Sequence, residues 1–345
     1  MQIDIFLEFA SPPGPRDLAS VFEDNIAIAR AADAAGFGAV WIAEHHFLGD
    51  YSNASAPDML LSAIARETER IGLGFAIVPL PITDPVRVAE RLATLDLLSG
   101  GRPMWGAGRG GTVTELEGFG VDPSDSRPLF RGRFDELRTL LSTGRTVRGE
   151  KPYEIRPRPG PHLAAGWLAA VSPESFELAA ELELDVMTGP FKPWPMVKSD
   201  LNRYRKMRPG GRSSFTLAVH CEEDHKSARH RAEPGLLWVY RKIFEVTRPL
   251  LSRQIAGYEH YRKLGWVTPL LDKVLSLTVL EAMGLAAVGD PAHILKRLQA
   301  LQASGLDRVS LVLGGGDLSR QEVVACIELL RDRVLPLLEK EAVVA

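Results

Sequence analysis

Short apolar runs alternate along this chain with segments in which apolar residues recur at helical spacing. Leu18, Phe22, Ile26 and Ala29 follow the first run at intervals of three or four residues, which is the period of one face of an α-helix. The short runs themselves are typical of buried strands. The segments predicted to be strands are residues 3–9, 39–43, 71–78, 103–107, 167–171, 184–187, 215–221 and 308–313.

Helix start and stop signals separate these runs. Asp84 and Pro85 form an N-cap followed by proline at the first helical position, and Gly100 after Ser99 suits a left-handed cap. Eight strands, each followed by a helical pattern, predict an α/β fold with one (β/α)8 TIM barrel that spans residues 1–345. The competing doubly wound sheet usually carries a glycine fingerprint after its first strand, and residues 11–15 lack it.

The connection between the seventh and eighth predicted strands is too long for a single crossover. Residues 224–287 are therefore predicted to form a largely helical insertion, placed as a lid or as part of a substrate pocket. Aromatic residues there, such as Trp238, suit a pocket lining or equally the core between helices. The candidates for a substrate pocket are Glu8, Phe191, Trp194 and Trp238.

Composition removes several classes of function. A formal net charge of −3 gives no basic field for nucleic acid. Cys221 and Cys326 lie far apart and match neither a disulfide framework nor a metal-site spacing. The first residues carry acids within an apolar run and lack the basic start of a signal peptide, and no run is long enough for a membrane span. A cytoplasmic enzyme or binding protein is expected.

The second predicted strand ends in Glu44, His45 and His46. Active sites of parallel barrels lie at the carboxyl ends of the strands, so this position favours chemistry over packing. Neighbouring strand residues point to opposite sides, so one histidine at most faces the pocket. A metal site would need further ligands, and His220 is the only other candidate, so no metal is expected. Either histidine could instead be a packed imidazole.

Two loops offer groups that bind anions. Gly108, Arg109 and Gly110 follow the fourth predicted strand, where glycine permits close approach to the backbone and arginine supplies a planar cation. Ser172 and Ser175 open the helix after the fifth strand, where backbone N–H groups and hydroxyls can bind a phosphate. Each loop is also compatible with an ordinary turn or helix start. Because the strands are neighbours, both loops could meet on one phosphate.

Taken together, these residues resemble the bacterial luciferase family of flavin-dependent monooxygenases over nearly the whole chain. Long motifs in one order carry the resemblance. They are Phe37-x-x-Val40-Trp41-x-x-Glu44-His45-His46-Phe47, residues 67–74, residues 76–90, Gly106-x-x-Arg109-Gly110, Ser126-Arg127 and Val288-Gly289-x-Pro291.

The resemblance implies that the barrel binds reduced FMN, which reacts with O2 to form a C4a-peroxyflavin that oxygenates an organic substrate. His45 matches the catalytic histidine of the family. Phe75 and Ala76 match the position of a non-proline cis peptide beneath the flavin ring, and Gly108 replaces a cysteine beside the flavin. Arg109, Ser172 and Ser175 match the phosphate contacts of the family, and Gly110 is a further expected cofactor-binding position.

The chain also departs from luciferase. Glu8 ends the first strand where luciferase has an apolar residue, and the luciferase mobile loop is not recognisable between Lys263 and Val288. These departures favour another small organic substrate over a long-chain aldehyde. Since no nicotinamide fingerprint is present, a separate flavin reductase is expected, and the family resemblance implies a homodimer. The alternatives are an F420-dependent oxidoreductase on the same barrel and a non-catalytic flavin-binding relative.

Overall fold

Eight parallel strands close into a barrel in this computed structural model, which describes residues 1–14, 16–256, 258–259 and 274–342. The last strand pairs back onto the first and completes the ring. The (β/α)8 barrel predicted from the sequence is therefore confirmed. Its strands, in order around the ring, are β1 (Gln2–Leu7), β2 (Ala39–Ile42), β3 (Gly72–Pro79), β4 (Pro103–Gly108), β7 (Trp167–Ala169), β8 (Asp185–Thr188), β9 (Ser213–Cys221) and β11 (Arg308–Leu313).

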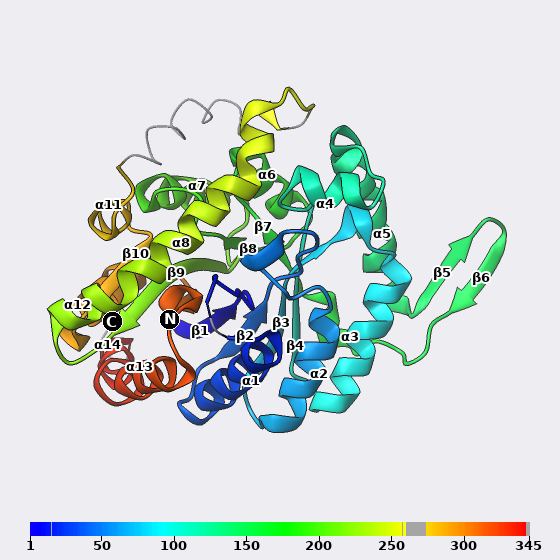
Figure 1. Ribbon diagram of the computed structural model, residues 1–345. Coiled ribbons are helices and arrows are strands. Elements are labelled where there is room, and N and C mark those ends of the chain that lie inside the picture. The colour runs from blue at the N-terminus through cyan, green and yellow to red at the C-terminus, as the bar shows by residue number, and fades with distance from the viewer. Residues whose placement is uncertain (15, 257, 260–273, 343–345) are drawn as a thin grey trace.

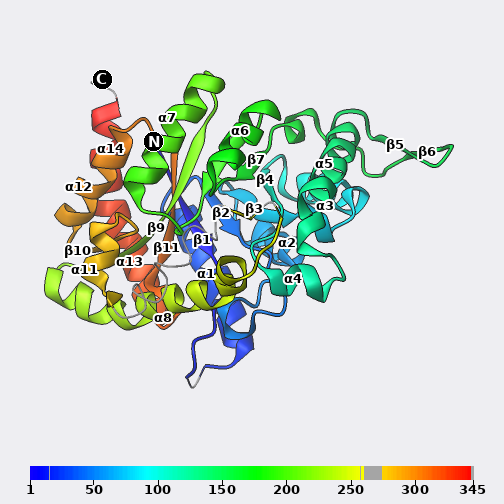
Figure 2. The same cartoon turned by 90° about the horizontal axis from the view of Figure 1, so that it is seen from above.

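Helices surround the barrel (Figures 1 and 2). The expected ends of the helix after β3 are confirmed, because the Asp84 side chain accepts from Val86 N and Gly100 adopts φ of 69°. Among the described residues, no helix is both long enough and apolar enough to cross a membrane. The outer helices are α1 (Leu18–Ala34), α2 (Pro57–Glu67), α3 (Pro85–Ser99), α5 (Ser126–Thr143), α6 (Pro173–Glu181), α7 (Trp194–Met207), α12 (Pro291–Gln302), α13 (Arg320–Arg333) and α14 (Leu335–Ala342).

Short helical elements fill several connections between strands and helices. Two are α-helical and five are single 3-10 turns. They are α4 (Val113–Gly118), α11 (Leu277–Ala282), η1 (Gly49–Tyr51), η2 (Leu80–Ile82), η3 (Pro123–Asp125), η4 (Pro161–Ala164) and η5 (Gly314–Gly316).

Two features differ from the sequence-based prediction. An antiparallel hairpin, β5 (Arg145–Arg148) and β6 (Lys151–Glu154), projects from the barrel (Figures 1 and 2). Its charged residues hide the apolar alternation that marks a strand. A short strand, β10 (Ala286–Gly289), pairs with residues 218–221 of β9, beyond the segment of β9 that pairs with β8. So short an apolar run cannot be told from helix by its pattern.

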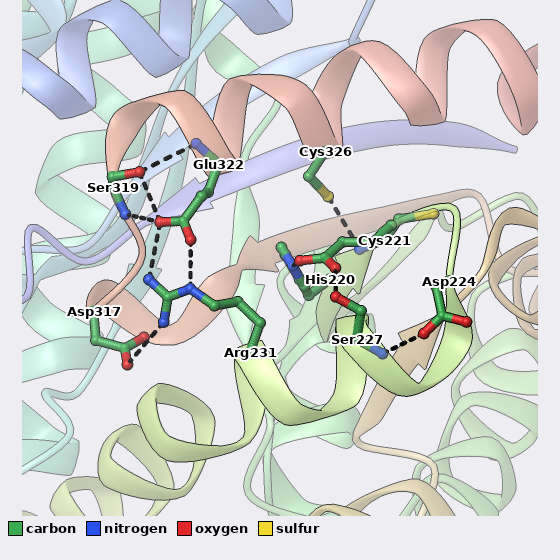
Figure 3. Close-up of polar contacts among 10 residues, drawn as sticks. His220, Cys221, Asp224, Ser227, Arg231, Asp317, Ser319, Glu322 and Cys326 are labelled. Carbon is green, nitrogen blue, oxygen red and sulfur yellow. Dashed lines mark hydrogen bonds and ion pairs between the residues drawn. The ribbon is translucent and has the colours of Figure 1, made fainter.

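The predicted insertion begins with one long helix, α8 (His225–Ser252), which crosses the front of the barrel in Figure 1. Figure 3 shows how its first half is anchored: the Arg231 guanidinium bonds both carboxylate oxygens of Glu322 at the start of α13. Glu322 is itself held in a capping box with Ser319. Residues 260–273 of the predicted insertion lie outside the described residues.

A buried ion pair joins the two strands that close the barrel. In β11, Arg308 donates from Nε and Nη2 to the two carboxylate oxygens of Asp4 in β1, each at 2.7 Å. Trp41 Nε1 in β2 donates to the same carboxylate at 2.9 Å. Asp4 is fully buried, and burial raises its pKa although Arg308 and Trp41 oppose the shift. The seam of the barrel therefore depends on charges that must remain paired.

We expect Arg308→Met to lower the free energy of unfolding by roughly 3–5 kcal/mol, because it leaves the Asp4 carboxylate buried without its cation. Denaturant unfolding followed by circular dichroism measures the change. As a control, Arg131→Gln removes the exposed pair with Glu181 and should cost less than about 1 kcal/mol. Equal losses in the two variants would contradict the importance assigned to the seam.

Candidate active site

A cavity of about 210 Å3 opens at the carboxyl ends of the strands. Its walls come from all eight barrel strands or the residues that directly follow them, from α8 and from Tyr258. Val239, Ile243 and Thr247 of α8 line one side. Arg231 anchors the other half of α8 to Glu322.

His45 lies on the cavity wall just after β2, and its ring is held by a carboxylate. Nδ1 of His45 is 3.0 Å from Glu115 Oε1. The same carboxylate accepts from His46 N at 2.9 Å and from Thr112 Oγ1 at 2.8 Å. An ionised carboxylate can only accept hydrogen bonds, so we assign a proton to His45 Nδ1, which donates it to Glu115. The other ring nitrogen, Nε2, faces the cavity. The His46 ring is not part of the described cavity lining and packs against the Phe119 ring, with the two ring centroids 4.8 Å apart.

Opposing effects set the protonation of this pair. Burial disfavours the imidazolium of His45, but the hydrogen bond to Glu115 and the nearby carboxylates of Glu8 and Glu44 outweigh it and raise the pKa of His45. Burial likewise opposes ionisation of Glu115, yet its hydrogen bonds to His45, His46 and Thr112 lower its pKa. The structure therefore favours a charged imidazolium–carboxylate pair beside the cavity.

A second carboxylate, Glu8, faces the other nitrogen of the same ring. Its Oε1 accepts from Tyr51 OH at 3.2 Å, and its Oε2 lies 3.9 Å from His45 Nε2. Oε2 is buried and has no hydrogen-bond partner among the described residues. Burial raises the pKa of Glu8, against the effect of His45 and the Tyr51 hydroxyl. Within the described part of the chain, no three His, Cys, Asp or Glu side chains converge as around a metal ion.

The same cavity is lined by the groups expected to bind phosphate. Arg109, Ser172 and Ser175 all line it. The Arg109 guanidinium lies 4.4 Å from the ring centroid of Tyr258. Ser175 Oγ donates to Ser172 O at 2.6 Å and accepts from Val171 N at 3.0 Å. In this arrangement Ser175 shapes the loop, while the Ser172 side chain makes no capping bond to α6.

Backbone geometry explains the two glycines beside Arg109. A Cβ atom on Gly108 would lie 2.8 Å from Ile77 Cδ1, so a larger residue there would have to displace the Ile77 side chain. Gly110 adopts φ of 93°, a conformation that favours glycine. The non-proline cis peptide lies between Ala76 and Ile77, one residue later than the predicted Phe75–Ala76 position.

Several predicted positions are not at the cavity. Phe75 is buried in the main core, and Ala76 and Ile77 line the cavity instead. Trp194 packs against Phe215 with ring centroids 4.9 Å apart, and Trp238 packs against the core. Neither tryptophan is among the described residues that line the cavity. The structure therefore does not place these two tryptophans at the cavity, since Trp194 is buried and Trp238 is half-buried against the core.

Glu8 and Phe191 do line the cavity, as do Gly108 and Gly110. Among the further cavity residues, Tyr51 and Glu115 carry polar groups that the sequence-based prediction did not include. Glu115 had a usable signal, since Thr112 three residues before it fits a capping box at the start of a helix. Tyr51 lies in a short turn without a distinguishing pattern.

Comparison with known sequences defines the family. The sequence model of the luciferase-like monooxygenases matches residues 1–308, so the chain belongs to this family. It is similar to limonene 1,2-monooxygenase of Rhodococcus erythropolis, with 27% identity over 88% of this chain and 78% of the relative. It is also similar to the oxygenase component of the flavin-dependent trigonelline monooxygenase of Acinetobacter baylyi, with 22% identity over 97% and 95% of the two chains.

Solved structures share the fold at low sequence identity. Monooxygenase RslO1 of Streptomyces bottropensis aligns with a TM-score of 0.79 and 23% identity over 98% of this chain and 99% of its own. The oxygenating constituent of 3,6-diketocamphane monooxygenase of Pseudomonas putida, in complex with FMN, aligns with a TM-score of 0.77 and 18% identity. The alignment covers 97% of this chain and 98% of that structure. An F420-dependent secondary alcohol dehydrogenase aligns with a TM-score of 0.72 and 16% identity over 96% of this chain and 98% of its own.

We expect Glu115→Gln to lower the pKa of His45. The carboxylate is a main cause of the upward shift, and without it burial, which disfavours the imidazolium, is opposed only by Glu8 and Glu44. An NMR titration of 15N-histidine-labelled protein measures the change. Glu222→Gln, beside His220, is the control and should leave His45 unchanged. An unchanged His45 pKa in Glu115→Gln would refute the role assigned to Glu115 in raising it.

Proposed function

We propose that the protein is the oxygenase component of a two-component monooxygenase that uses reduced FMN and O2 to oxygenate a small organic substrate. The observation that carries the proposal is one cavity lined both by Arg109 and Ser172, which suit a phosphate, and by the imidazole of His45. Membership of the luciferase-like monooxygenase family supports an oxidoreductase of this class.

The residues present fit the proposed cofactor. Arg109 offers a planar cation, and Ser172 offers a hydroxyl and the N-terminus of α6, which together suit a phosphate. Ala76 and Ile77, on the neighbouring strand β3, present a small apolar surface, which suits a flat ring. Gly108 leaves room beside the Ile77 side chain. We therefore assign the phosphate to Arg109 and Ser172 and the ring to the Ala76–Ile77 side.

The chain's own residues would bind, orient and move a proton. When bound, reduced FMN supplies two electrons for activating O2, so that one oxygen atom enters the substrate and the other leaves as water. His45, fixed by Glu115, would hold or deliver a proton at Nε2 beside that reaction. The apolar side chains of α8 would keep water from the cavity, where it would divert activated oxygen into peroxide.

A reductase partner is part of the proposal. The trigonelline relative is named as an oxygenase component, and no nicotinamide fingerprint occurs in this sequence. A separate flavin reductase would therefore supply reduced FMN. The homodimer implied by the family resemblance stays a prediction, as does the identity of the substrate.

Binding of reduced cofactors distinguishes this function from its alternatives. Anaerobic protein is titrated with photoreduced FMN and, separately, with reduced F420, and then O2 is admitted. We expect reduced FMN to bind more tightly and to reoxidise more slowly when bound than when free, because the cavity excludes water. Tight F420 binding without affinity for reduced FMN would instead identify an F420-dependent oxidoreductase. Binding without any effect on the O2 reaction would indicate a non-catalytic relative.

Arg109→Ala should weaken FMN binding about tenfold or more while changing riboflavin binding little, because only FMN carries the phosphate. Quenching of flavin fluorescence measures both dissociation constants. Arg131→Ala, which removes an exposed arginine on α5, is the matched control and should change neither. If riboflavin and FMN lose affinity equally in Arg109→Ala, the phosphate must be bound elsewhere.

A further inference from the structure

Glu8 lies where two cavities meet. A second, smaller crevice runs between β1 and β11 on one side and α1 and α13 on the other. It shares part of its lining with the main cavity, namely Phe6, Glu8, Tyr51, Val239 and Val312. One carboxyl group therefore borders both the proposed flavin cavity and a separate route through the helical layer.

The crevice has a polar mouth. Asp24 lies there between two arginines, 3.7 Å from Arg16 Nη1 and 3.7 Å from Arg320 Nε, and all three residues line the crevice. Its volume is about 70 Å3, whereas one water molecule needs roughly 10–15 Å3 on this measure. The crevice is therefore large enough for several water molecules, and its lining includes both the charged mouth and Glu8.

At the inner end, the geometry directs one oxygen of Glu8 at His45. Tyr51 OH fixes Oε1, which leaves Oε2 buried and without a hydrogen-bond partner among the described residues, 3.9 Å from His45 Nε2. A small rotation of the carboxyl group, or one bridging water, converts this separation into a hydrogen bond. Nδ1 is already bonded to Glu115, so Nε2 is the nitrogen through which His45 can exchange a proton.

The charges around the pair keep a proton available. Burial raises the pKa of Glu8, and carboxylates that outweigh burial raise the pKa of His45. A carboxyl group that is easily protonated can both accept and release a proton. The charged or titratable groups that face the pair are Tyr51, Glu115 and Glu44 near the rings, and Arg16, Asp24 and Arg320 at the mouth.

We propose that Glu8 is a positioning residue that exchanges the His45 proton with solvent through this crevice, so that the proton does not cross the flavin cavity. The Nε2 proton of the imidazolium passes to Glu8 Oε2, and the carboxyl group releases a proton to water in the crevice. The reverse sequence reloads His45, and no electron is transferred. The inference rests on the proposed function only for the reason such a route is needed, because a water-free flavin cavity must still be supplied with protons.

Proton exchange in the protein without cofactor tests the route. NMR of 15N-histidine-labelled protein measures the exchange rate of the His45 Nε2 proton with water. Glu8→Gln keeps the size of the side chain but cannot relay a proton, so we expect exchange to slow about tenfold or more. Val323→Phe on α13 should fill the crevice and slow exchange without changing a charged group. Ile28→Phe repeats the block from α1 if Val323→Phe does not fold.

The controls and outcomes separate the alternatives. Glu222→Gln, which removes a carboxylate from His220 outside the cavity, should leave His45 exchange as in the wild type. Unchanged exchange in Glu8→Gln would overturn the proposal and leave Glu8 as a substrate contact. Slowed exchange in Glu8→Gln with no effect of either crevice block would overturn the route. If the expected exchange pattern appears but reduced FMN does not bind, the relay stands and the proposed function fails.

Discussion

The pairing of β1 with β11 is the constraint on which the site depends. It joins the first and last strands of the barrel, and the buried Asp4–Arg308 pair holds this seam at the amino ends of the strands. Because the same two strands run on to the cavity, closure brings Glu8 from the start of the chain beside Val312 from its end. A barrel opened at this seam would separate the walls of both cavities.

At the other end of the strands, the site is organised around one imidazole. His45 lies between Glu115, which bonds Nδ1, and Glu8, which faces Nε2. Each carboxylate is fixed by a hydroxyl group: Thr112 bonds Glu115, and Tyr51 bonds Glu8. The two acids differ in charge preference, because hydrogen bonds favour ionised Glu115 whereas burial favours neutral Glu8. One ring nitrogen is therefore anchored and the other is left for proton transfer.

The alternation of apolar runs and helical patterns was enough to predict the barrel, because each strand is buried on both sides and each helix has one apolar face. It was also enough to place His45, Arg109 and Ser172 on one face, since all three directly follow strands. Glu115 could not be predicted as the partner of His45. Its contact depends on how α4 folds back over the end of β2, which no local pattern encodes.

Other differences have the same kind of cause. Trp194 and Trp238 are aromatic residues on helices, and the direction in which a helix turns its side chains depends on its packing. In a regular strand Phe75 and Ile77 would face the same side. The register of β3 against β4 shifts between Phe75 and Val78, so Ile77 borders the cavity while Phe75 lies in the core. β10 is too short to be distinguished from the helical pattern around it.

A crystal structure of the protein with FMN is the most direct test of the central claim, that one cavity holds the phosphate at one end and the reacting edge of the ring at the other. The account predicts the phosphate against Arg109 and Ser172, the ring on the Ala76–Ile77 wall, and its reacting edge facing His45 Nε2. A flavin bound with its phosphate away from Arg109, or with its ring outside the reach of His45, would contradict it.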